Sequence, residues 1–563
     1  MKRSIGALTL VVSAGLWYAA LPPRGPAAPP PGGEETVVRG VLHVHTSRSD
    51  GTGTVEDVAA AAARAGLDFV IVTDHGDGMR PPDPPAYRQG VLCIDGVEIA
   101  TRDGHLLALG LPAAPFPLGG DARDAVEDVA RLGGAAIAAH PGSAKADLQW
   151  TDWSLPATGL EWLNGDSEWR DESVWSLAHA LISYPARRVE TLLSTLDRPV
   201  SVLDQWDRLT RNRRAVAVAG TDAHARVGLR SLGEPYDRTA AFRVPGYDRM
   251  FGVFSNVVTD TTLSGDAVAD TARVLDAIRA GRTYTRIDAI DRTGTLAFAA
   301  EIEGRRAVSG EVLPEGKAVA LRAELNNPPA GARLRLLRNG EVVAEAEGPV
   351  LTHATDGTPG AYRVEVHAPG APGAPPVPWI VSNPVYVGAY SDAPAAAPRP
   401  VPTAVSVQYA DGAATGWTIE ASPAALGAID VSPMPRGTQL ALRYAVGGAE
   451  SQSPYVAFVM PAGGMLGGHD RLLFRGTSER PMRVSVQLRE PGGEQGRRWQ
   501  RSVVLDSTPR DVVVYFDELR PADEGLSPLA LDRVDSVLFV VDTVHTPLGA
   551  SGRFWIDDVK YAR

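Results

Sequence analysis

The chain of 563 residues has a single cysteine, Cys93, so it can form neither an internal disulfide nor a cysteine-based zinc site. It also has no long basic run, and its formal charge is −12 with a pI near 5.5. These values argue against a nucleic-acid scaffold, whose surface would be basic. Neither a G-x-S-x-G elbow nor a P-loop is found, which removes two rival hydrolase chemistries.

An uncharged segment stands at the N-terminus. Lys2 and Arg3 precede a stretch without charges from Ser4 to Leu21, which is the order of an export signal. No clean A-x-A site and no lipobox cysteine follow, so an uncleaved N-terminal membrane anchor is the alternative. The next residues are rich in Pro, Gly and Ala and predict a tether, which gives a leader of residues 1–33. We therefore expect an exported protein, periplasmic or associated with the cell envelope.

The following part of the chain has the pattern of an α/β domain. Strand-like and helix-like segments alternate from residue 37 to about 225, and a helix at Ala267 to Gly281 closes the domain, which is predicted to span 34–290. Cys93 lies in an apolar run and is expected to be a small buried side chain.

Two all-β domains are predicted after it. The first is an Ig-like β-sandwich over 291–390, in which Asn339-Gly340 forms the two-residue turn of a hairpin. A Pro/Ala linker over 391–402 follows. Residues 403–563 contain many strand-like runs and few helical ones, which predicts a larger sandwich of jelly-roll type.

Histidines are concentrated in the α/β domain. Seven of the eleven fall between residues 43 and 224, and six of these seven lie in short motifs near apolar runs. The motifs, most of which fall at strand ends, are His43-Val44-His45, Ser49-Asp50-Gly51, Thr73-Asp74-His75, Gly96-Val97-Glu98, His105, His140-Pro141 and Gly220-Thr221-Asp222-Ala223-His224. Because sites in β/α folds collect at the carboxyl ends of strands, we expect one converging site.

This pattern predicts a site for several metal ions. His43 and His45 point to the same face of a strand, and the carboxylate of Glu98 can bridge two ions. A single histidine can simply satisfy backbone groups, and His179, which lies in a helical run without a motif, is expected to be structural. Nine candidate ligands together, six histidines and three carboxylates, favour metal binding, because each unpaired buried polar group costs roughly 1–3 kcal/mol.

These residues, in this order, resemble the PHP superfamily (polymerase and histidinol phosphatase) over residues 37 to about 225. The resemblance implies a distorted (β/α)7 barrel that holds two or three metal ions. Segments at Gly159–Asn164, before Gly281-Arg282 and at Trp379–Pro384 look like the CehA/McbA-like branch. Segments at Trp499–Leu505, Leu538–Asp542 and Phe554–Asp558 are similar to the galactose-binding-like jelly rolls of carbohydrate-binding modules.

The resemblance also implies how nine ligands are shared among three ions. His43 and His45 would hold one ion with Asp222, Glu98 would bridge to a second ion held by His105 and His140, and Asp50, His75 and His224 would hold the third. Some members have a histidine where this chain has Asp50, which favours a harder ion at that position. Mn, Fe and Zn all stay open as the metal.

Four other residues are candidates for the site. Asp74, assigned a catalytic role beside Glu98, is expected to orient a ligand imidazole, with capping of its own loop as the alternative. Arg48, Lys145 and Arg226 lie near the motifs and are candidates to bind an anionic substrate, with a solvated surface charge as the alternative.

The predicted function is a metal-dependent hydrolase that cleaves a small phosphoester by means of a metal-bridging hydroxide. The first alternative is a carbamate or carboxylic ester hydrolase that uses the same site. The second alternative is a noncatalytic envelope protein that binds a glycan through its C-terminal domain.

Overall fold

The computed structural model describes residues 17–24, 37–226, 244–392, 399–409, 414–434, 438–447, 453–462, 464, 466–523 and 528–563. Most of the expected leader and the centre of the expected linker lie outside these residues. Within them, no helix has the length and apolar character that a membrane span requires. The chain divides into two compact units, the first made of Met1–Asp77, Pro81–Pro112 and Asp121–Ala395, the second of Gly78–Arg80, Ala113–Gly120 and Ala396–Arg563.

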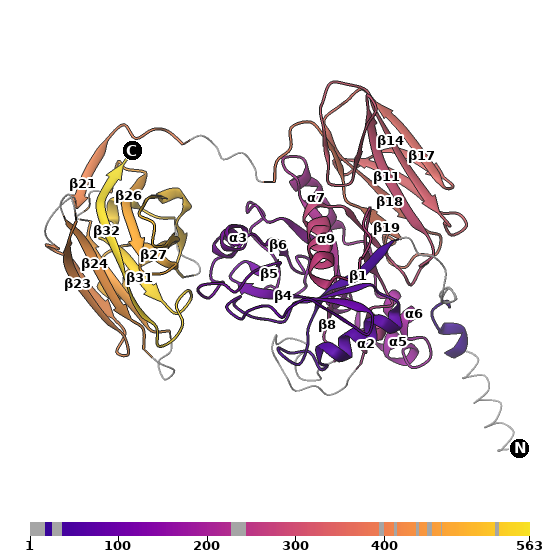
Figure 1. Cartoon of the computed structure of the whole chain (residues 1–563), viewed down its shortest axis with the longest axis horizontal. Coiled ribbons are helices and arrows are strands. Elements are labelled where there is room, and N and C mark those ends of the chain that lie inside the picture. The colour runs from indigo at the N-terminus through magenta and orange to yellow at the C-terminus, as the bar shows by residue number, and fades with distance from the viewer. Residues whose placement is uncertain are drawn as a thin grey trace, which may run out of the picture. The chain divides into compact units, whose positions relative to one another are not determined.

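The first unit contains a closed barrel of seven strands, of which Figure 1 labels β1, β4, β5, β6 and β8. In barrel order they are β1 (Val38–Val44), β2 (Phe69–Val72), β4 (Val91–Thr101), β5 (Gly104–Leu109), β6 (Ala135–Ala138), β7 (Gly159–Asn164) and β8 (Val216–Ala223), and β8 pairs again with β1. Strand β5 runs antiparallel to both β4 and β6, whereas the other barrel pairs are parallel. The seven-stranded barrel is confirmed, and within it β5 runs in the opposite direction to its neighbours.

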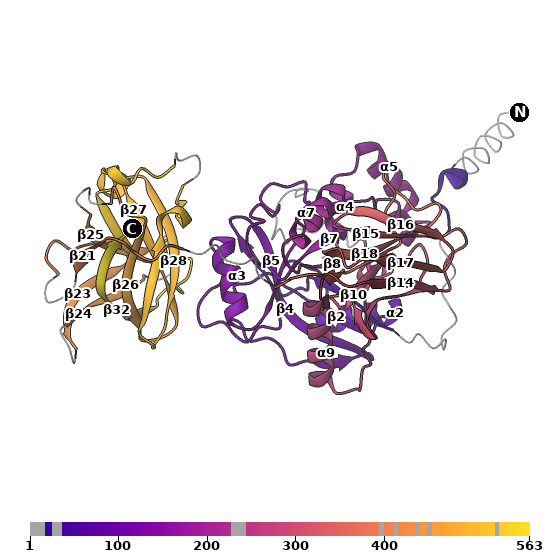
Figure 2. The ribbon, with the colours of Figure 1, turned by 90° about the horizontal axis from the view of Figure 1, so that it is seen from above.

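Helices lie around the barrel (Figure 2). They are α2 (Val55–Ala65), α3 (Ala122–Arg131), α4 (Gly165–Arg170), α5 (Val174–Ser183), α6 (Arg188–Leu193), α7 (Val200–Thr210), α8 (Tyr247–Met250) and α9 (Ala267–Ala280). Helix α2 begins with a capping box formed by Thr54 and Asp57 and ends at Gly66, whose φ of 72° suits glycine. The buried Cys93 belongs to the core that α2 shares with the sheet, as expected.

The barrel sheet continues into the following β-rich segment. Short strand β3 (Ala86–Arg88) pairs with β4, and β9 (Ser255–Val258) joins β1 to β10 (Thr283–Arg286). Strand β10 then pairs with β19 (Ile380–Ser382), so one sheet runs from the barrel into β18 (Gly360–His367), β20 (Val385–Val387) and β13 (Val312–Leu313). The barrel and this segment are therefore joined by backbone hydrogen bonds.

A second, four-stranded sheet completes the sandwich in this segment. It contains β12 (Arg305–Val308), β11 (Thr295–Ile302), β14 (Val319–Asn326) and β17 (Val350–Thr355). The expected hairpin is confirmed: β15 (Arg333–Arg338) pairs antiparallel with β16 (Glu341–Glu347). Asn339 and Gly340 form its turn, with φ of 53° and 88°. Both values are positive, as a type I′ turn requires.

Asn383 ties this segment to the barrel, and we expect its replacement by alanine to destabilise both parts together. Its side-chain Oδ1 accepts from Ala217 N at 2.8 Å, and Nδ2 donates to Ala217 O at 2.9 Å and Thr283 Oγ1 at 2.9 Å. Loss of these buried bonds should lower the free energy of unfolding by about 2–4 kcal/mol. In urea, the barrel and this segment should unfold in one shared transition, with and without the substitution. Asn326→Ala, at an exposed position, is the control; separate transitions of the barrel and the segment would contradict the coupling.

The second unit is a sandwich of two six-stranded antiparallel sheets. One sheet contains β21 (Val405–Tyr409), β23 (Leu426–Pro433), β24 (Thr438–Ala445), β26 (Arg471–Ser478), β29 (Arg510–Tyr515) and β32 (Ser551–Ala562). The other contains β22 (Thr418–Ala421), β25 (Tyr455–Pro461), β27 (Met482–Arg489), β28 (Arg498–Leu505), β30 (Arg520–Pro521) and β31 (Ser536–Asp542). The jelly-roll type stays a prediction.

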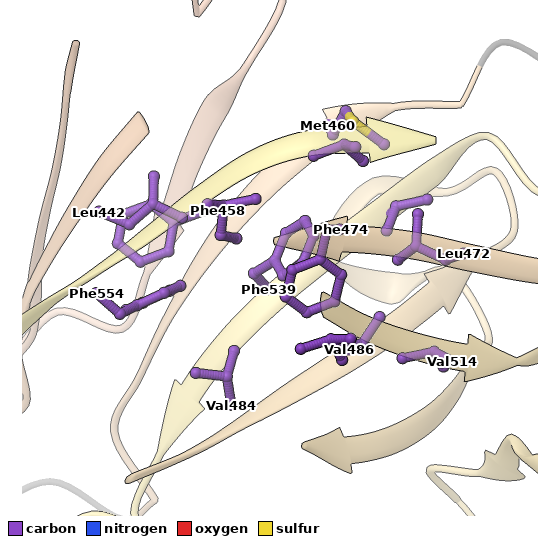
Figure 3. Close-up of a cluster of buried hydrophobic side chains, with 14 of the residues drawn as sticks. Leu442, Phe458, Met460, Leu472, Phe474, Val484, Val486, Val514, Phe539 and Phe554 are labelled. Carbon is purple, nitrogen blue, oxygen red and sulfur yellow. The ribbon is translucent and has the colours of Figure 1, made fainter. Parts of the chain in front are cut away.

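Aromatic and aliphatic side chains fill the space between these two sheets (Figure 3). The Phe474 and Phe539 rings meet edge to face at 5.3 Å, and Phe458 meets Phe554 in the same way at 5.7 Å. Such aromatic pairs add roughly 0.5–1.5 kcal/mol beyond the area that they bury. The second unit therefore has a hydrophobic core of its own.

Candidate metal centre

The predicted ligands lie at or near the ends of barrel strands. His43 lies near the end of β1, His140 follows β6, and Asp222 lies near the end of β8. All three have positive φ, at 63°, 29° and 47°. Residues other than glycine seldom adopt this conformation, which costs on the order of 1–3 kcal/mol and collects at functional sites. The strands thus hold three ligands in a strained backbone conformation.

The carboxylate of Glu98 lies at the centre of the cluster. Its Oε1 is 2.7 Å from His105 Nδ1 and 2.9 Å from His140 Nε2. Its Oε2 is 3.1 Å from His45 Nε2, and 3.2 Å from both His43 Nε2 and His75 Nδ1. One buried carboxylate therefore faces five imidazole nitrogens, and its two oxygens face different sets of them, as a bridging ligand requires.

All nine predicted ligands are brought together in four overlapping groups. The groups are His45, Asp50, His75 and His224; His43, Glu98 and His140; His43, His45 and Asp222; and His75, Glu98 and His105. The group of His43, His45 and Asp222 is the one that the resemblance implies. His105 and His140, which were expected to share an ion, lie in separate groups, each with Glu98. Within each group the potential ligand atoms lie within 4.8 Å of one another.

The spacing of the atoms in this cluster suits the binding of divalent cations better than it suits hydrogen bonding. His45 Nε2 is buried without a hydrogen-bond partner, although it lies 3.1 Å from Glu98 Oε2 and 3.2 Å from Asp222 Oδ1. Neighbouring ligands of an ion bound at about 2.0–2.2 Å lie roughly 3 Å apart. The nitrogen therefore lies at the spacing of neighbouring metal ligands from each of the two oxygens.

The outward-facing nitrogens of several rings are held in place. His43 Nδ1 lies 2.7 Å from Glu161 Oε1, His140 Nδ1 lies 3.1 Å from Leu148 O, and His224 Nδ1 lies 2.9 Å from the backbone oxygen of Asp222. If each Nδ1 carries the proton and donates it to its oxygen, the other nitrogen of the ring is unprotonated and faces the cluster. Partners of this kind orient the histidine ligands of metal sites.

Glu161 is a functional residue that the sequence interpretation missed. Besides His43, its carboxylate accepts hydrogen bonds from His140 N at 2.7 Å and from Asn164 Nδ2 at 2.8 Å. Asn164 in turn caps helix α4. The available signal was one acidic residue inside the otherwise uncharged run Gly159–Asn164, where burial requires a partner.

Burial and the neighbouring charges shift the pKa values of these groups in opposite directions. Burial lowers the pKa of His43, but the carboxylates of Asp222, Glu161 and Glu98 outweigh it and raise the pKa well above its usual value. The pKa of His75 falls to about 4, mainly through burial. The surrounding imidazoles hold the pKa of Glu98 well below its usual range despite burial. The cluster therefore keeps its carboxylates ionised and attracts positive charge.

Asp74 has contacts that match the loop-capping alternative. Its carboxylate accepts hydrogen bonds from Thr46 N and Thr46 Oγ1, both at 2.7 Å, and from Ser49 Oγ at 2.6 Å. Ser49 Oγ lies 3.4 Å from His45 Nδ1, so the carboxylate of Asp74 reaches this imidazole through the serine hydroxyl. Of the two expected roles, orientation of an imidazole and capping of the loop, these contacts favour fixation of the loop that carries Asp50.

Arg48 differs from the other two cationic candidates. Its guanidinium pairs with Asp83 at 2.6 Å and Asp95 at 3.4 Å, so its charge is balanced by acidic neighbours. Lys145 and Arg226 line the cavity that opens onto the cluster, and Arg226 Nη2 donates to Asp50 Oδ2 at 3.0 Å. These two remain the candidates for holding an anion.

The cavity over the cluster has a volume of about 190 Å³ and two kinds of wall. Asp50, His75, Glu98, His105, His140, Asp222 and His224 form the polar floor. An apolar wall comes mainly from Trp169, Leu192, Leu196, Met250, Val253 and Phe254. The site can therefore hold a charged group at the floor next to an apolar group at the wall.

We expect Gly220→Ala to disturb the centre through Glu161. A Cβ at this position would lie 1.7 Å from Glu161 Oε1, so the carboxylate that orients His43 would have to move. We expect loss of at least one metal equivalent and a fall of about 1–3 kcal/mol in the free energy of unfolding. Elemental analysis measures the metal content, and urea unfolding measures the free energy of unfolding. Gly252→Ala, where the nearest atoms lie 3.5 Å away, is the control. Full metal content in both the Gly220→Ala and the Gly252→Ala variants would contradict the role of Glu161.

No family model matches the chain. A segment of 78 residues is 33% identical to a phosphoribosyl 1,2-cyclic phosphate 1,2-diphosphodiesterase of Eggerthella lenta, and covers 12% of this chain and 30% of that protein. The chain thus spans about a third of the length of this curated relative.

Two similar solved structures come from different classes. A two-domain protein of Bacteroides vulgatus, described as containing a predicted PHP-like metal-dependent phosphoesterase, is 15% identical with a TM-score of 0.27, and the match covers 64% of this chain and 98% of that one. A family 11 carbohydrate-binding module of Clostridium thermocellum is 17% identical with a TM-score of 0.24, over 28% of this chain and 94% of the module.

Proposed function

We propose that the protein is a metal-dependent hydrolase of the PHP type that cleaves phosphoester bonds. The observation that carries this proposal is the buried Glu98 carboxylate, which faces five imidazole nitrogens beside Asp50 and Asp222. Burying so many polar groups is costly, and cations bound among these carboxylates and imidazoles would offset that cost. The similarity of 78 residues to a cyclic phosphate diphosphodiesterase supports a phosphoester as the substrate. Membership of the CehA/McbA-like branch is part of the proposal.

The nine ligands would hold two or three divalent ions. Such ions supply a Lewis acid for the phosphoryl oxygens and lower the pKa of water. The residues of the chain supply the remaining parts of the site. Lys145 and Arg226 place positive charge beside the cavity, where they favour an anionic group. Glu161 keeps His43 in position, and Asp74 fixes the loop of Asp50.

The apolar wall of the cavity favours a second candidate activity. Trp169, Leu196 and Phe254 offer a surface for an aromatic or aliphatic group and carry no charge that selects phosphorus over carbon. An aryl carbamate or a carboxylic ester therefore fits the same cavity. The two activities are separated by a screen of aryl phosphates, phosphodiesters, aryl carbamates and aryl esters that share one leaving group.

We expect the full chain to purify with two or three equivalents of Mn, Fe or Zn when chelators are avoided. Elemental analysis of the purified protein provides the measurement. Asp50→Ala should remove one equivalent if three ions are bound, because Asp50 belongs to the group of His45, His75 and His224. Unchanged content in this variant would show that two ions are bound. Less than one equivalent in the unaltered chain, together with no hydrolysis after reloading, would reject the proposal.

A further inference from the structure

Helix α5 presents a large apolar face to solvent. The exposed fractions are 79% for Val174, 85% for Trp175, 77% for Leu181 and 57% for Ile182. Val174 and Leu181, like Trp175 and Ile182, are seven residues apart and therefore lie on one side of the helix. Within α5 only Ser183 is buried. Single exposed apolar residues are common, but several together on one helix mark a binding surface.

Residues near the N-terminus, within the segment 17–24, contact this helix. Trp17 Nε1 donates to the backbone oxygen of Ile182 at 3.4 Å, and His179 Nε2 lies 2.7 Å from Ala20 O. Trp17 and Tyr18 are themselves 41% and 56% exposed. Both views show the short indigo helix of this segment near α5 (Figure 1, Figure 2). The described end of the uncharged stretch, residues 17–21, thus contacts the helix that carries the apolar face.

A cationic hollow lies beside the same segment. It has a volume of about 460 Å³, and its basic lining residues are Arg187, Arg188, Arg249 and Arg292. Of the two acidic residues that line it, Asp288 is already paired with Arg286 at 2.6 Å. Arg187 also donates to Pro22 O, which joins the hollow to the N-terminal segment. In a chain with a net charge of −12, this concentration of arginine is a local exception.

We propose that α5 and the arginine hollow together bind the surface of an anionic lipid membrane, with α5 lying in the interface. An interfacial helix buries an apolar face among the lipids, and nearby basic residues bind the anionic headgroups. Trp and Tyr, here Trp17, Tyr18 and Trp175, are enriched at the level of the headgroups. A second copy of the chain fits less well, because a twofold contact centred on this face would bring the two arginine hollows near each other.

Sedimentation of the full chain with vesicles tests this proposal. The vesicles are phosphatidylcholine alone, or phosphatidylcholine with about 30% phosphatidylglycerol, because the basic residues require anionic lipid. We expect binding at least ~10-fold stronger to the anionic vesicles, since each arginine near such a surface contributes roughly a fivefold gain. The double variant Trp175→Glu with Leu181→Glu should bind anionic vesicles ~10-fold or more weakly. The double variant Arg188→Glu with Arg292→Glu should lose affinity by a similar factor, and only for anionic vesicles.

The control is Val268→Glu, which places the same charge at a 68% exposed position on α9. All variants should keep the melting temperature and metal content of the unaltered chain. If the variant with Trp175→Glu and Leu181→Glu bound vesicles as tightly as the control, the N-terminal stretch alone would anchor the chain. The proposal would then be rejected. It would also be rejected if the arginine variant bound both vesicles like the control. A vesicle-free dimer that only the α5 variant dissociates would identify a second copy as the partner instead.

Discussion

Glu98→Gln is expected to lower kcat on a small aryl phosphate by at least ~100-fold, because the losses reported for residues that merely support metal ligands already reach about 10–100-fold. Glutamine keeps the shape of the side chain but removes the negative charge. Without that charge, Oε1 and Oε2 no longer balance cations held by two different sets of imidazoles. The metal content should fall together with the rate, and elemental analysis of the same sample measures it.

Glu56→Gln is the matched control for this experiment. It makes the same chemical change at an exposed position on α2, where Glu56 pairs with Arg88 at 3.2 Å. Its turnover and metal content should equal those of the unaltered chain. Nearly unaltered turnover of Glu98→Gln, with inactivity of His179→Ala on the exposed side of α5, would show that the site has been assigned to the wrong residues.

Most of the nine candidate ligands could be placed at one site because their positions follow from a simple rule. Polar residues after buried parallel strands converge at one end of a barrel. Glu98 within β4 and His105 at the start of the antiparallel β5 fall outside this rule. The division of the nine ligands among ions could not be predicted. His43 is close to Glu98 and Asp222 at once, and this depends on the direction of each ring, which spacing in the sequence does not specify.

The supporting residues were harder to predict for a similar reason. Glu161 reaches His43 from a strand more than a hundred residues away, and only the fold brings the two together. For Asp74 the sequence left two roles open, and its hydrogen bonds to Thr46 and Ser49 favour one of them. The charge of Arg48 is balanced by Asp83 and Asp95, two partners that no local motif indicates.

The sequence indicated only part of the relation between the barrel and the β-rich segment predicted to be Ig-like. A change of pattern near residue 290 indicates a new sandwich, and the hairpin at Asn339-Gly340 follows from local turn chemistry. The pairing of β10 with β19 joins segments about a hundred residues apart. Such long-range pairing leaves no local signal, so the continuous sheet could not be predicted.

The parts of the chain before and after the Pro/Ala-rich stretch are expected to separate fully in function, although Gly78–Arg80 and Ala113–Gly120 of the second unit stay with the first part. A fragment of residues 34–392 should fold and keep the turnover of the full chain, and a fragment of residues 403–563 should fold without hydrolysing any ester. The first must extend to residue 392, because Ser391 O accepts from Arg214 N at 2.8 Å and Asp392 pairs with Arg214 at 2.5 Å. The second keeps the bond from Thr403 N to Arg563 O at 2.6 Å.

The same two fragments decide between an enzyme and a glycan-binding protein. We propose that residues 403–563 contact a glycan of the cell envelope; on β32, Trp555 is partly exposed beside Arg553, whereas Trp499 is buried. Trp555→Ala should then weaken retention on insoluble polysaccharide and leave turnover of a soluble aryl phosphate unchanged. An inactive 34–392 fragment beside an active full chain would reject the independence of the units. If neither the full chain nor that fragment, reloaded with Mn, Fe or Zn, cleaves a phosphoester or an aryl carbamate while the chain still binds a glycan, the enzyme proposal fails, because the cluster around Glu98 would then have no catalytic use.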